Sequence, residues 1–396
     1  MEFYDVVVIG GGPIGSTVAN ELAEKGVSVL VIERKSEVGY PNHCSGMVST
    51  EFPEVVHFPS SLITNNIHGA TVYSASQSTF SFKRERSFAI VIDRINFDRY
   101  LYSKATENGA SFLFGGNVSS FERTNDGIKL FVDKQAERIS LSSKMVVVAT
   151  GATSSVKKMF GFDDFAGREI YTIQSETFFS SQDPSMVDIL MDNSVSHNWF
   201  SWVIPVSATK ARIGLGTDRR ENLKSLTMTL SDKFLPLKGQ NISYENPVVW
   251  SIPTGLIKES VKDNVLLVGD SARQVKPFSG GGLYTGILSA RFAAHVILEA
   301  LANNDFSKGF LQKYERRWKS TVGKEIRLEL FMRDVYTTLT DDDKDSIIKN
   351  LNRDSMEQVI QNYGVIDKPW KAGFRIILAS KTPYYYLRRK ITLFSK

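Results

Sequence analysis

The sequence has few residues that support a disulfide, a metal site or a membrane-spanning helix. Its 396 residues include one cysteine and five histidines, so neither an internal disulfide nor a metal site with the usual ligand spacing is expected. The single Cys44 fits a reducing cytoplasm. No stretch reaches the roughly 18 consecutive apolar residues of a transmembrane helix. The N-terminus leads directly into a strand pattern, without the features of a secretory signal.

Acidic residues are missing from the C-terminal end. The chain carries 48 Lys and Arg against 43 Asp and Glu, but residues 368–396 hold eight Lys or Arg and no acid. The remainder is slightly acidic, so we expect no nucleic-acid-binding surface on the body. Aromatic residues lie among the basic ones in this tail, which is typical of a segment lying on a membrane surface. The alternative is a C-terminal helix docked on the body with its basic face in solvent.

The first 33 residues carry a dinucleotide-binding pattern. The apolar run 4–9 leads into a Gly-x-Gly-x-x-Gly turn and then a helical segment. Gly10 permits the tight turn, Gly12 lets the backbone approach a diphosphate, and Gly15 lets the helix pack closely on the strand. A second apolar run ends in Glu33, where an acid binds the hydroxyls of an adenosine ribose. The pattern predicts FAD or NAD at this turn, and not NADP.

Two later regions have the pattern of ligand-binding turns. The apolar run ending in Ala149 and Gly151 is typical of a central buried strand. The run 264–268 is followed by Asp270, whose carboxylate can accept hydrogen bonds from ribityl or ribose hydroxyls. Gly280–Gly282 then open a long helix, and their N–H groups suit an anion such as the reduced flavin ring. A capped helix after a turn is the alternative for each feature alone.

Two side chains are candidates for contact with the cofactor or the substrate. Cys44 lies in a polar loop after the second strand, and such loops face the ligand crevice of a parallel sheet. Its thiol could gate access or donate a weak hydrogen bond, or it is a small buried apolar group. Arg94 follows Asp93, the expected cap of a helix. Its guanidinium could reach a phosphate or a flavin edge, or it is a surface charge.

Together these elements resemble a known family. The glycine turn with Glu33, Arg94 in an Asp-Arg-x-x-Phe-Asp run, Ala149-Thr150-Gly151, and Asp270 with Pro277 and Gly280–Gly282 are similar to FAD proteins of the p-hydroxybenzoate hydroxylase architecture. Within that group the Cys44 loop, the stretch 200–205 and the chain length resemble the archaeal geranylgeranyl reductases, which include the digeranylgeranylglycerophospholipid reductases.

The resemblance implies an enzyme that reduces carbon–carbon double bonds in geranylgeranyl chains of archaeal ether lipids or their precursors. Hydride would come from reduced FAD, and a proton from a separate donor. Cys44, Phe200 and Trp202 are then the candidate catalytic residues. Phe200 replaces a family tyrosine, which removes a hydroxyl and leaves the proton source open. The implied FAD contacts are Gly10, Gly12, Pro13, Gly15, Glu33, Arg34, Cys44, Arg94, Ala149, Gly151, Asp270, Pro277, Gly280, Gly281 and Gly282.

The expected fold class is α/β, with a Rossmann-like, glutathione-reductase-type FAD-binding domain and an inserted mixed β-sheet. We assign residues 1–66, 93–165 and 262–305 to the FAD-binding domain, and residues 67–92 and 166–261 to the substrate-binding sheet. Residues 306–396 form a C-terminal helical region with the basic tail. Within it, the pattern predicts one long charged helix over 308–339.

Two other functions share these motifs: a flavin monooxygenase that hydroxylates a small substrate, and a flavoprotein that only transfers electrons. Only one dinucleotide turn is present, since Gly214-Leu215-Gly216 leads into no second one. NAD(P)H would therefore bind transiently, or a ferredoxin-like protein would supply electrons. The expected partners are an isoprenoid lipid, this donor and a membrane surface touched by the tail. The expected location is the cytoplasm, peripheral on the inner face of the membrane.

Overall fold

The first large sheet contains the N-terminal strand at its centre. The computed structural model describes residues 2–152, 155–162, 165–220, 222–351 and 358–362, with Gly364 and Arg375. Strands run in the order β19-β20-β11-β1-β2-β8, and β10 and β9 extend antiparallel from β11. Their bounds are β1 Glu2–Ile9, β2 Val29–Glu33, β8 Ser111–Phe114, β9 Asn117–Thr124, β10 Gly127–Lys134, β11 Glu137–Val148, β19 Val261–Lys262 and β20 Val265–Leu267.

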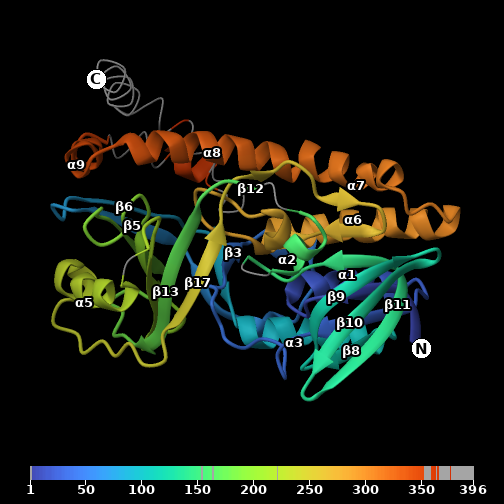
Figure 1. Cartoon of the computed structure of the whole chain (residues 1–396). Helices are drawn as coiled ribbons and strands as arrows, with labels where there is room; N and C mark the ends of the chain where they lie inside the picture. Colours follow the sequence, from blue (N-terminus) through green and yellow to red (C-terminus); the bar gives the residue numbers. More distant parts are fainter. Residues whose placement is uncertain are drawn as a thin grey trace.

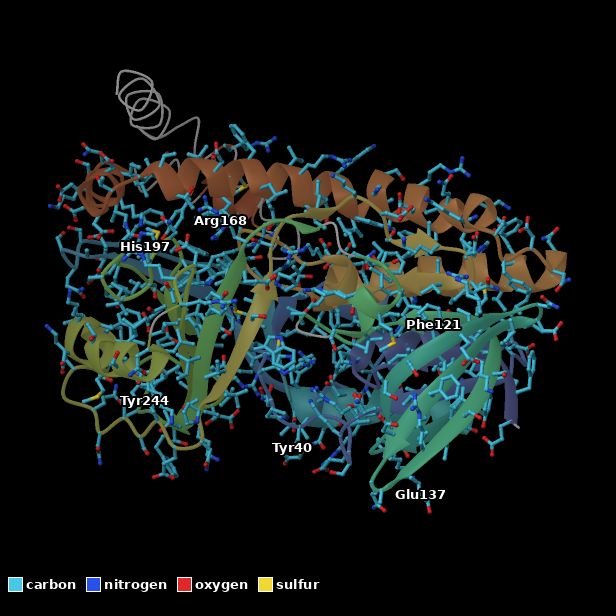
Figure 2. All side chains as sticks on the ribbon, in the orientation of Figure 1. Tyr40, Phe121, Glu137, Arg168, His197 and Tyr244 are labelled. Atoms are coloured by element: carbon cyan, nitrogen blue, oxygen red, sulfur yellow. The ribbon has the colours of Figure 1, made fainter. Side chains whose placement is uncertain are left out.

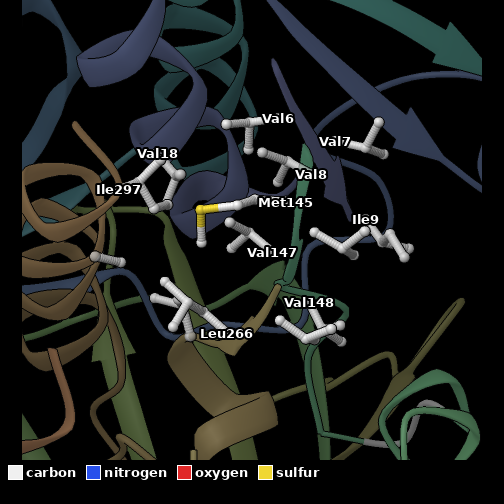
Figure 3. Packing of buried hydrophobic residues seen from close by; sticks show 14 of the residues in the cluster. Val6, Val7, Val8, Ile9, Val18, Met145, Val147, Val148, Leu266 and Ile297 are labelled. Atoms are coloured by element: carbon white, nitrogen blue, oxygen red, sulfur yellow. The ribbon is translucent and has the colours of Figure 1, made fainter. Parts of the chain in front are cut away.

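The centre of this sheet is apolar on both faces. In β1, Val6 to Ile9 are all buried, as are the facing residues of the parallel strands β2 and β11. Helices α1 (Pro13–Ala23) and α6 (Leu283–Asn303) contribute Val18 and Ile297 to this core (Figure 3). A strand covered on both faces has a continuous apolar run and not an alternating one, which explains the pattern at residues 4–9.

The second large sheet holds seven strands in the order β17-β13-β16-β15-β14-β5-β6. One face packs on α5 (Leu223–Lys233), where Leu226 and Leu230 meet Ile213 and Leu215 of β16. The other face is turned toward the first sheet. The strands are β5 Gly69–Ser74, β6 Thr79–Lys83, β13 Glu169–Phe178, β14 Met186–Met191, β15 Ser201–Pro205, β16 Lys210–Thr217 and β17 Val248–Pro253.

Residues 67–92, which the sequence assigns to one sheet, divide between two. β5 and β6 join the seven-stranded sheet, whereas β7 (Ala89–Ile92) pairs with β3 (Met47–Ser49) and β4 (Ile63–Ile67) in a separate small sheet. The alternation of apolar residues is local, so it predicts strands but not their partners. The shorter elements are α2 Phe52–Val55, η1 Ser60–Leu62, α4 Val156–Met159, β12 Phe165–Ala166, η2 Leu235–Leu237, β18 Leu256–Ile257 and η3 Gly269–Ala272.

The C-terminal helices form a layer across both large sheets (Figure 1). The expected single helix over 308–339 is wrong, because the chain breaks at Thr321 (φ −110°, ψ −90°) into α7 (Lys308–Ser320) and α8 (Val322–Thr338). α7 packs on α6, and α9 (Asp341–Lys349) packs on β5 and β6. The tail at 368–396 lies outside the described residues, apart from Arg375.

The α/β fold class predicted from the sequence is confirmed. The predicted helix after Asp93 is α3 (Arg94–Glu107), and the Asp93 side chain accepts a hydrogen bond from the Asn96 N–H. In the described part of the chain, α6 alone is long and apolar enough to span a membrane, and 56% of its apolar window is buried inside the protein.

Candidate functional site

A cavity of about 710 Å³ lies between the two large sheets. Its wall combines the glycine turn after β1, the ends of β11 and β20, the start of α6, and the inner face of the seven-stranded sheet. Almost every site residue proposed from the sequence lines it; Gly15 and Pro277 are the exceptions. Elements more than 200 residues apart therefore meet around one volume.

At one end of the cavity lies the β1–α1 turn. Gly10 has a φ of +110°, which favours glycine, and Gly12 caps α1 with Pro13 as the first helical residue. A side chain at Gly15 would collide with the Gly10 carbonyl, so Gly15 packs the helix onto the turn. A Cβ at Gly12 would meet nothing within 4 Å. The backbone at Gly12 is thus open to a ligand at a helix N-terminus, which suits a diphosphate.

Glu33 stands at the end of β2, beside this turn. Its carboxylate accepts hydrogen bonds from the Gly11 N–H (2.7 Å) and the Lys35 N–H (2.8 Å). An ionised carboxylate has about four acceptor sites, so two remain for ligand hydroxyls. Arg34, next in the chain, also lines the cavity. These groups fit the adenosine half of a dinucleotide.

Arg94 is not a surface charge. The side chain is 6% exposed, and its Nη2 donates to both oxygens of Asp98 at 2.9 and 3.1 Å. Although burial opposes ionisation, Asp98 and the neighbouring Cys44 raise the pKa of Arg94 above its ordinary value. A fixed guanidinium therefore lies in the cavity wall beside the thiol.

The turns after β11 and β20 are tied together at the middle of the cavity. Ala149 donates its N–H to the Ile9 carbonyl, and the Ser271 hydroxyl donates to the Gly151 carbonyl at 3.1 Å. Asp270 lies next to Gly282, the residue that caps α6. Burial raises the pKa of the Asp270 carboxyl to about 6, while Lys157 and Arg94 oppose the rise. Gly280 and Gly281 complete this part of the wall.

The seven-stranded sheet supplies an aromatic wall. The Trp202 indole N–H donates to Gln174 Oε1 at 3.0 Å, and the Gln174 amide donates to the Cys44 carbonyl at 3.3 Å. The ring of Phe200 lies 6.0 Å from that of Trp202. Cys44, half-buried and free, lines the cavity with both. All three candidate catalytic residues are thus brought together, and Gln174 connects two of them.

Several residues of this wall carry no sequence motif. His43 stacks on Trp250, with ring centroids 3.9 Å apart and an angle of 18°. Burial, together with the nearby charge of Arg94, lowers the pKa of His43 to about 3, so the imidazole is neutral. Gln174, Arg333 and Tyr336 also belong to the cavity or support it. Only the alternation of Thr172 and Gln174 along β13 could have indicated that face, and α8 gives no local indication.

The fold and the cavity together define a class: an α/β flavoprotein whose cavity lies between a sheet with a glycine turn after β1 and a second, separate sheet. Over residues 5–374 the chain matches the family model described as lycopene cyclase protein. It is 32% identical to an uncharacterised protein of Methanocaldococcus jannaschii, over 94% of this chain and 95% of that one.

Two named proteins are also similar along most of their length. The chain is 30% identical to digeranylgeranylglycerophospholipid reductase 1 of Methanococcoides burtonii, over 90% of each chain. The crystal structure of a geranylgeranyl bacteriochlorophyll reductase-like protein from Thermoplasma acidophilum has a TM-score of 0.83 and 26% identity, over 95% of this chain and 96% of that one. The chain belongs to the family of these digeranylgeranylglycerophospholipid reductases, within the lycopene cyclase protein family. The family predicted from the sequence is confirmed.

Proposed function

We propose that this protein is an FAD-dependent reductase of carbon–carbon double bonds in the geranylgeranyl chains of isoprenoid ether lipids or their precursors. The observation that carries the proposal is the shared cavity, which places a dinucleotide turn and an aromatic, apolar wall around one volume. The names of the relatives, reductases of digeranylgeranylglycerophospholipids, support the choice of substrate.

The cavity has residues suited to each part of FAD. Glu33 and Arg34 would hold the adenosine ribose and its surroundings, and the N–H groups near Gly12 would hold the diphosphate. Asp270 would accept from the ribityl hydroxyls, and Gly280–Gly282 would lie against the pyrimidine side of the flavin. When bound and reduced, the flavin supplies the hydride. Ala149, Gly151 and Arg94 would shape the remaining contacts.

The protein's own contribution is to hold an apolar chain in a dry place. Alternate residues of two neighbouring strands face the cavity: Val72 on β5, and Val187, Ile189 and Met191 on β14. The intervening Asp188 bonds with Tyr73 instead, away from the cavity lining. An unactivated alkene develops little charge that a protein can bind, so positioning and exclusion of water must supply most of the catalysis.

Proton delivery is the second task of the wall. Cys44 Sγ is a weak donor in the cavity lining, and its loop is held by Gln174 and by Arg212, whose Nη1 donates to the Ser45 carbonyl. His43 is neutral, so it is a poor acid there. We therefore propose that the Cys44 thiol donates the proton that the reduced double bond requires. Phe200 and Trp202 position the chain beside it.

Electrons come from a donor that binds transiently, either NAD(P)H or a ferredoxin-like protein, because the described cavity has one dinucleotide turn. We propose the division into an FAD-binding domain, a substrate-binding sheet and a C-terminal helical region, with the bounds given above. We also propose that the enzyme works in the cytoplasm, at the inner face of the membrane that holds its substrate, with the basic tail in contact with the lipid surface.

The test is an anaerobic single-turnover experiment. The purified protein is reduced with dithionite and mixed with a geranylgeranylated lipid, while the flavin absorbance near ~450 nm is followed and the lipid is analysed by mass spectrometry. Flavin reoxidation with a gain of two hydrogens per event is expected. A flavin that stays reduced until oxygen is admitted would instead indicate a monooxygenase or an electron carrier. Full turnover in both Cys44→Ala and Trp202→Ala would overturn the assigned wall.

A further inference from the structure

Arg333, on α8, has a buried guanidinium whose Nη2 lacks a hydrogen-bond partner in the described part of the chain. The side chain is 6% exposed and lines the cavity. Its Nη2 is buried, and no acceptor for it lies among the residues that the structure describes. The guanidinium lies over the face of Trp199, whose ring centroid is 4.7 Å from the guanidinium carbon. Burial lowers the pKa of Arg333 to about 10. A buried cation of this kind is costly unless an anion joins it.

The nearby acids do not neutralise this charge by direct pairing. Asp218 attracts Arg333, but the Asp218 oxygens accept hydrogen bonds from His197 Nδ1 (2.6 Å) and Asn198 Nδ2 (3.0 Å). Within the described ranges the ion-pair partner of Asp218 among the arginines is Arg168 (Figure 2 labels His197 and Arg168). Glu329, one helical turn before Arg333, accepts from the Phe278 N–H. Burial raises the pKa of Glu329 to about 7, so it offers only part of a countercharge.

A second donor faces the same part of the cavity. The Ser279 hydroxyl is buried in the wall and has no partner among the described residues. Its neighbour Phe278 packs edge-on against Tyr336 of α8, with ring centroids 5.9 Å apart. A side chain at Gly280 would approach Trp199 to 3.3 Å, so this loop lies next to the ring that the Arg333 guanidinium contacts.

We propose that Arg333, with Ser279, binds the phosphate group of the lipid substrate; this inference rests on the proposed function. A guanidinium presents two parallel N–H groups that match a phosphate, and stacking on an aromatic face fixes its plane. A glycerophospholipid has a charged group at one end and apolar chains at the other. The cavity lining contains both kinds of group, the Arg333 guanidinium and the apolar side chains of β5 and β14. The phosphate anchor would set which double bonds reach the flavin.

The experiment compares two lipids and four proteins. Digeranylgeranylglyceryl phosphate and the same lipid without its phosphate are offered to the wild-type holoenzyme and to Arg333→Met, Arg333→Lys and Arg327→Met. Arg327 lies on the exposed face of α8, where it donates to the Lys319 carbonyl, and is the matched control. Binding to the oxidised holoenzyme is followed by tryptophan fluorescence, because the Arg333 guanidinium lies over the ring of Trp199.

In Arg333→Met the preference for the phosphorylated lipid, in both affinity and kcat/KM, should fall roughly 10- to 100-fold, the usual range for a lost charged hydrogen bond. Arg333→Lys should recover part of it, and Arg327→Met should keep the wild-type preference. Equal losses for both lipids would show a structural role for Arg333 and overturn the inference. A wild-type protein that prefers the phosphorylated lipid in binding but reduces neither lipid would refute the proposed function and leave the anchor supported. Inorganic phosphate alone that competes with the lipid equally in wild type and Arg333→Met would also count against Arg333 as the phosphate anchor.

Discussion

At the scale of single residues, Gln174 decides how the aromatic wall is held. It is 6% exposed on β13, and its amide joins the Trp202 indole of β15 to the carbonyl of Cys44 in the loop before β3. Its oxygen accepts and its nitrogen donates, so neither bond can be kept by an apolar residue of the same size. Because Trp202 lies in the seven-stranded sheet and Cys44 in the loop before β3, Gln174 fixes the distance between the proposed proton donor and the substrate wall.

Gln174→Leu should therefore reduce kcat while the protein still folds and binds flavin. Loss of both bonds leaves two buried partners unpaired, at roughly 1–3 kcal/mol each. Gln174→Glu keeps an acceptor for Trp202 but loses the donor to Cys44, so it should be intermediate. The measurement is kcat, KM and the number of double bonds reduced, with the flavin spectrum as a check on the cofactor site. A normal product distribution in Gln174→Leu would show that the bridge does not position the chain.

The carboxyl group of Asp270 should make the apoprotein sensitive to pH. Its pKa is raised from 3.8 to about 6 by burial, so between these values the folded protein keeps a proton that the unfolded chain has lost. Stability from this group must then fall as the pH rises through that window and stay lower above it. Asp270→Asn should raise the Tm of the apoprotein more at pH 8 than at pH 4, while weakening flavin binding. The exposed Asp126→Asn is the control, and an equal Tm change at both pH values would contradict the assignment.

At the scale of elements, β16 is shaped to receive two indole rings. Its residues Ala211, Ile213 and Leu215 face α5, so Gly214 and Gly216 face the cavity side. A Cβ at Gly214 would lie 2.5 Å from the Trp202 ring, and one at Gly216 would collide with Trp199. The two glycines remove bulk where the tryptophans lie flat on the sheet.

Gly214→Ala should displace Trp202, and with it the bond to Gln174. Overpacking of this kind costs about 1–3 kcal/mol, so a lower Tm and a lower kcat are both expected. Gly309→Ala in α7 is the matched control, because its Cβ would find only the Ser307 hydroxyl, at 3.8 Å, and alanine favours a helix. If Gly214→Ala kept the wild-type Tm and turnover, the position of Trp202 would not depend on the missing side chain at residue 214.

The elements show which parts of the structure were predictable from the sequence. The strand, turn and helix at residues 4–25 and the acid at Glu33 follow from patterns within a few residues, and the structure places them as predicted. The pairing of β7 with β3 and β4 depends on partners 22 to 44 residues away, which a local alternation does not specify. The alternation along β13 indicates at most the face on which Gln174 lies, and nothing local indicates Arg333, because the significance of both residues arises only when β13 and α8 meet around the cavity.

At the scale of the whole molecule, the cavity joins two sheets that share few other elements. The residues directly after three strands of the first sheet, Gly10, Ala149 and Val268, line the cavity. Strands of the second sheet supply Thr172 and Trp202, and the helical layer crosses both sheets (Figure 1). A ligand that fills the cavity must therefore contact both sheets. Because a ligand stabilises only the state that binds it, its effect reports whether the sheets unfold together.

The apoprotein should accordingly unfold in a single transition, and FAD should raise the temperature of that transition. At a free concentration 100 times its Kd, the linkage term is about 2.7 kcal/mol, or roughly 3 °C in Tm for a chain of this size. Scanning calorimetry of the apoprotein with and without FAD measures it. Gly12→Asp is the control: a Cβ there meets nothing within 4 Å, and aspartate is a good helix cap, so the apoprotein should fold as before. Its carboxylate would repel the diphosphate and abolish the shift. The opposite result would be two transitions, with FAD raising the temperature of only the one that belongs to the first sheet. That result would show that the second sheet unfolds independently and gains no stability from the bound cofactor.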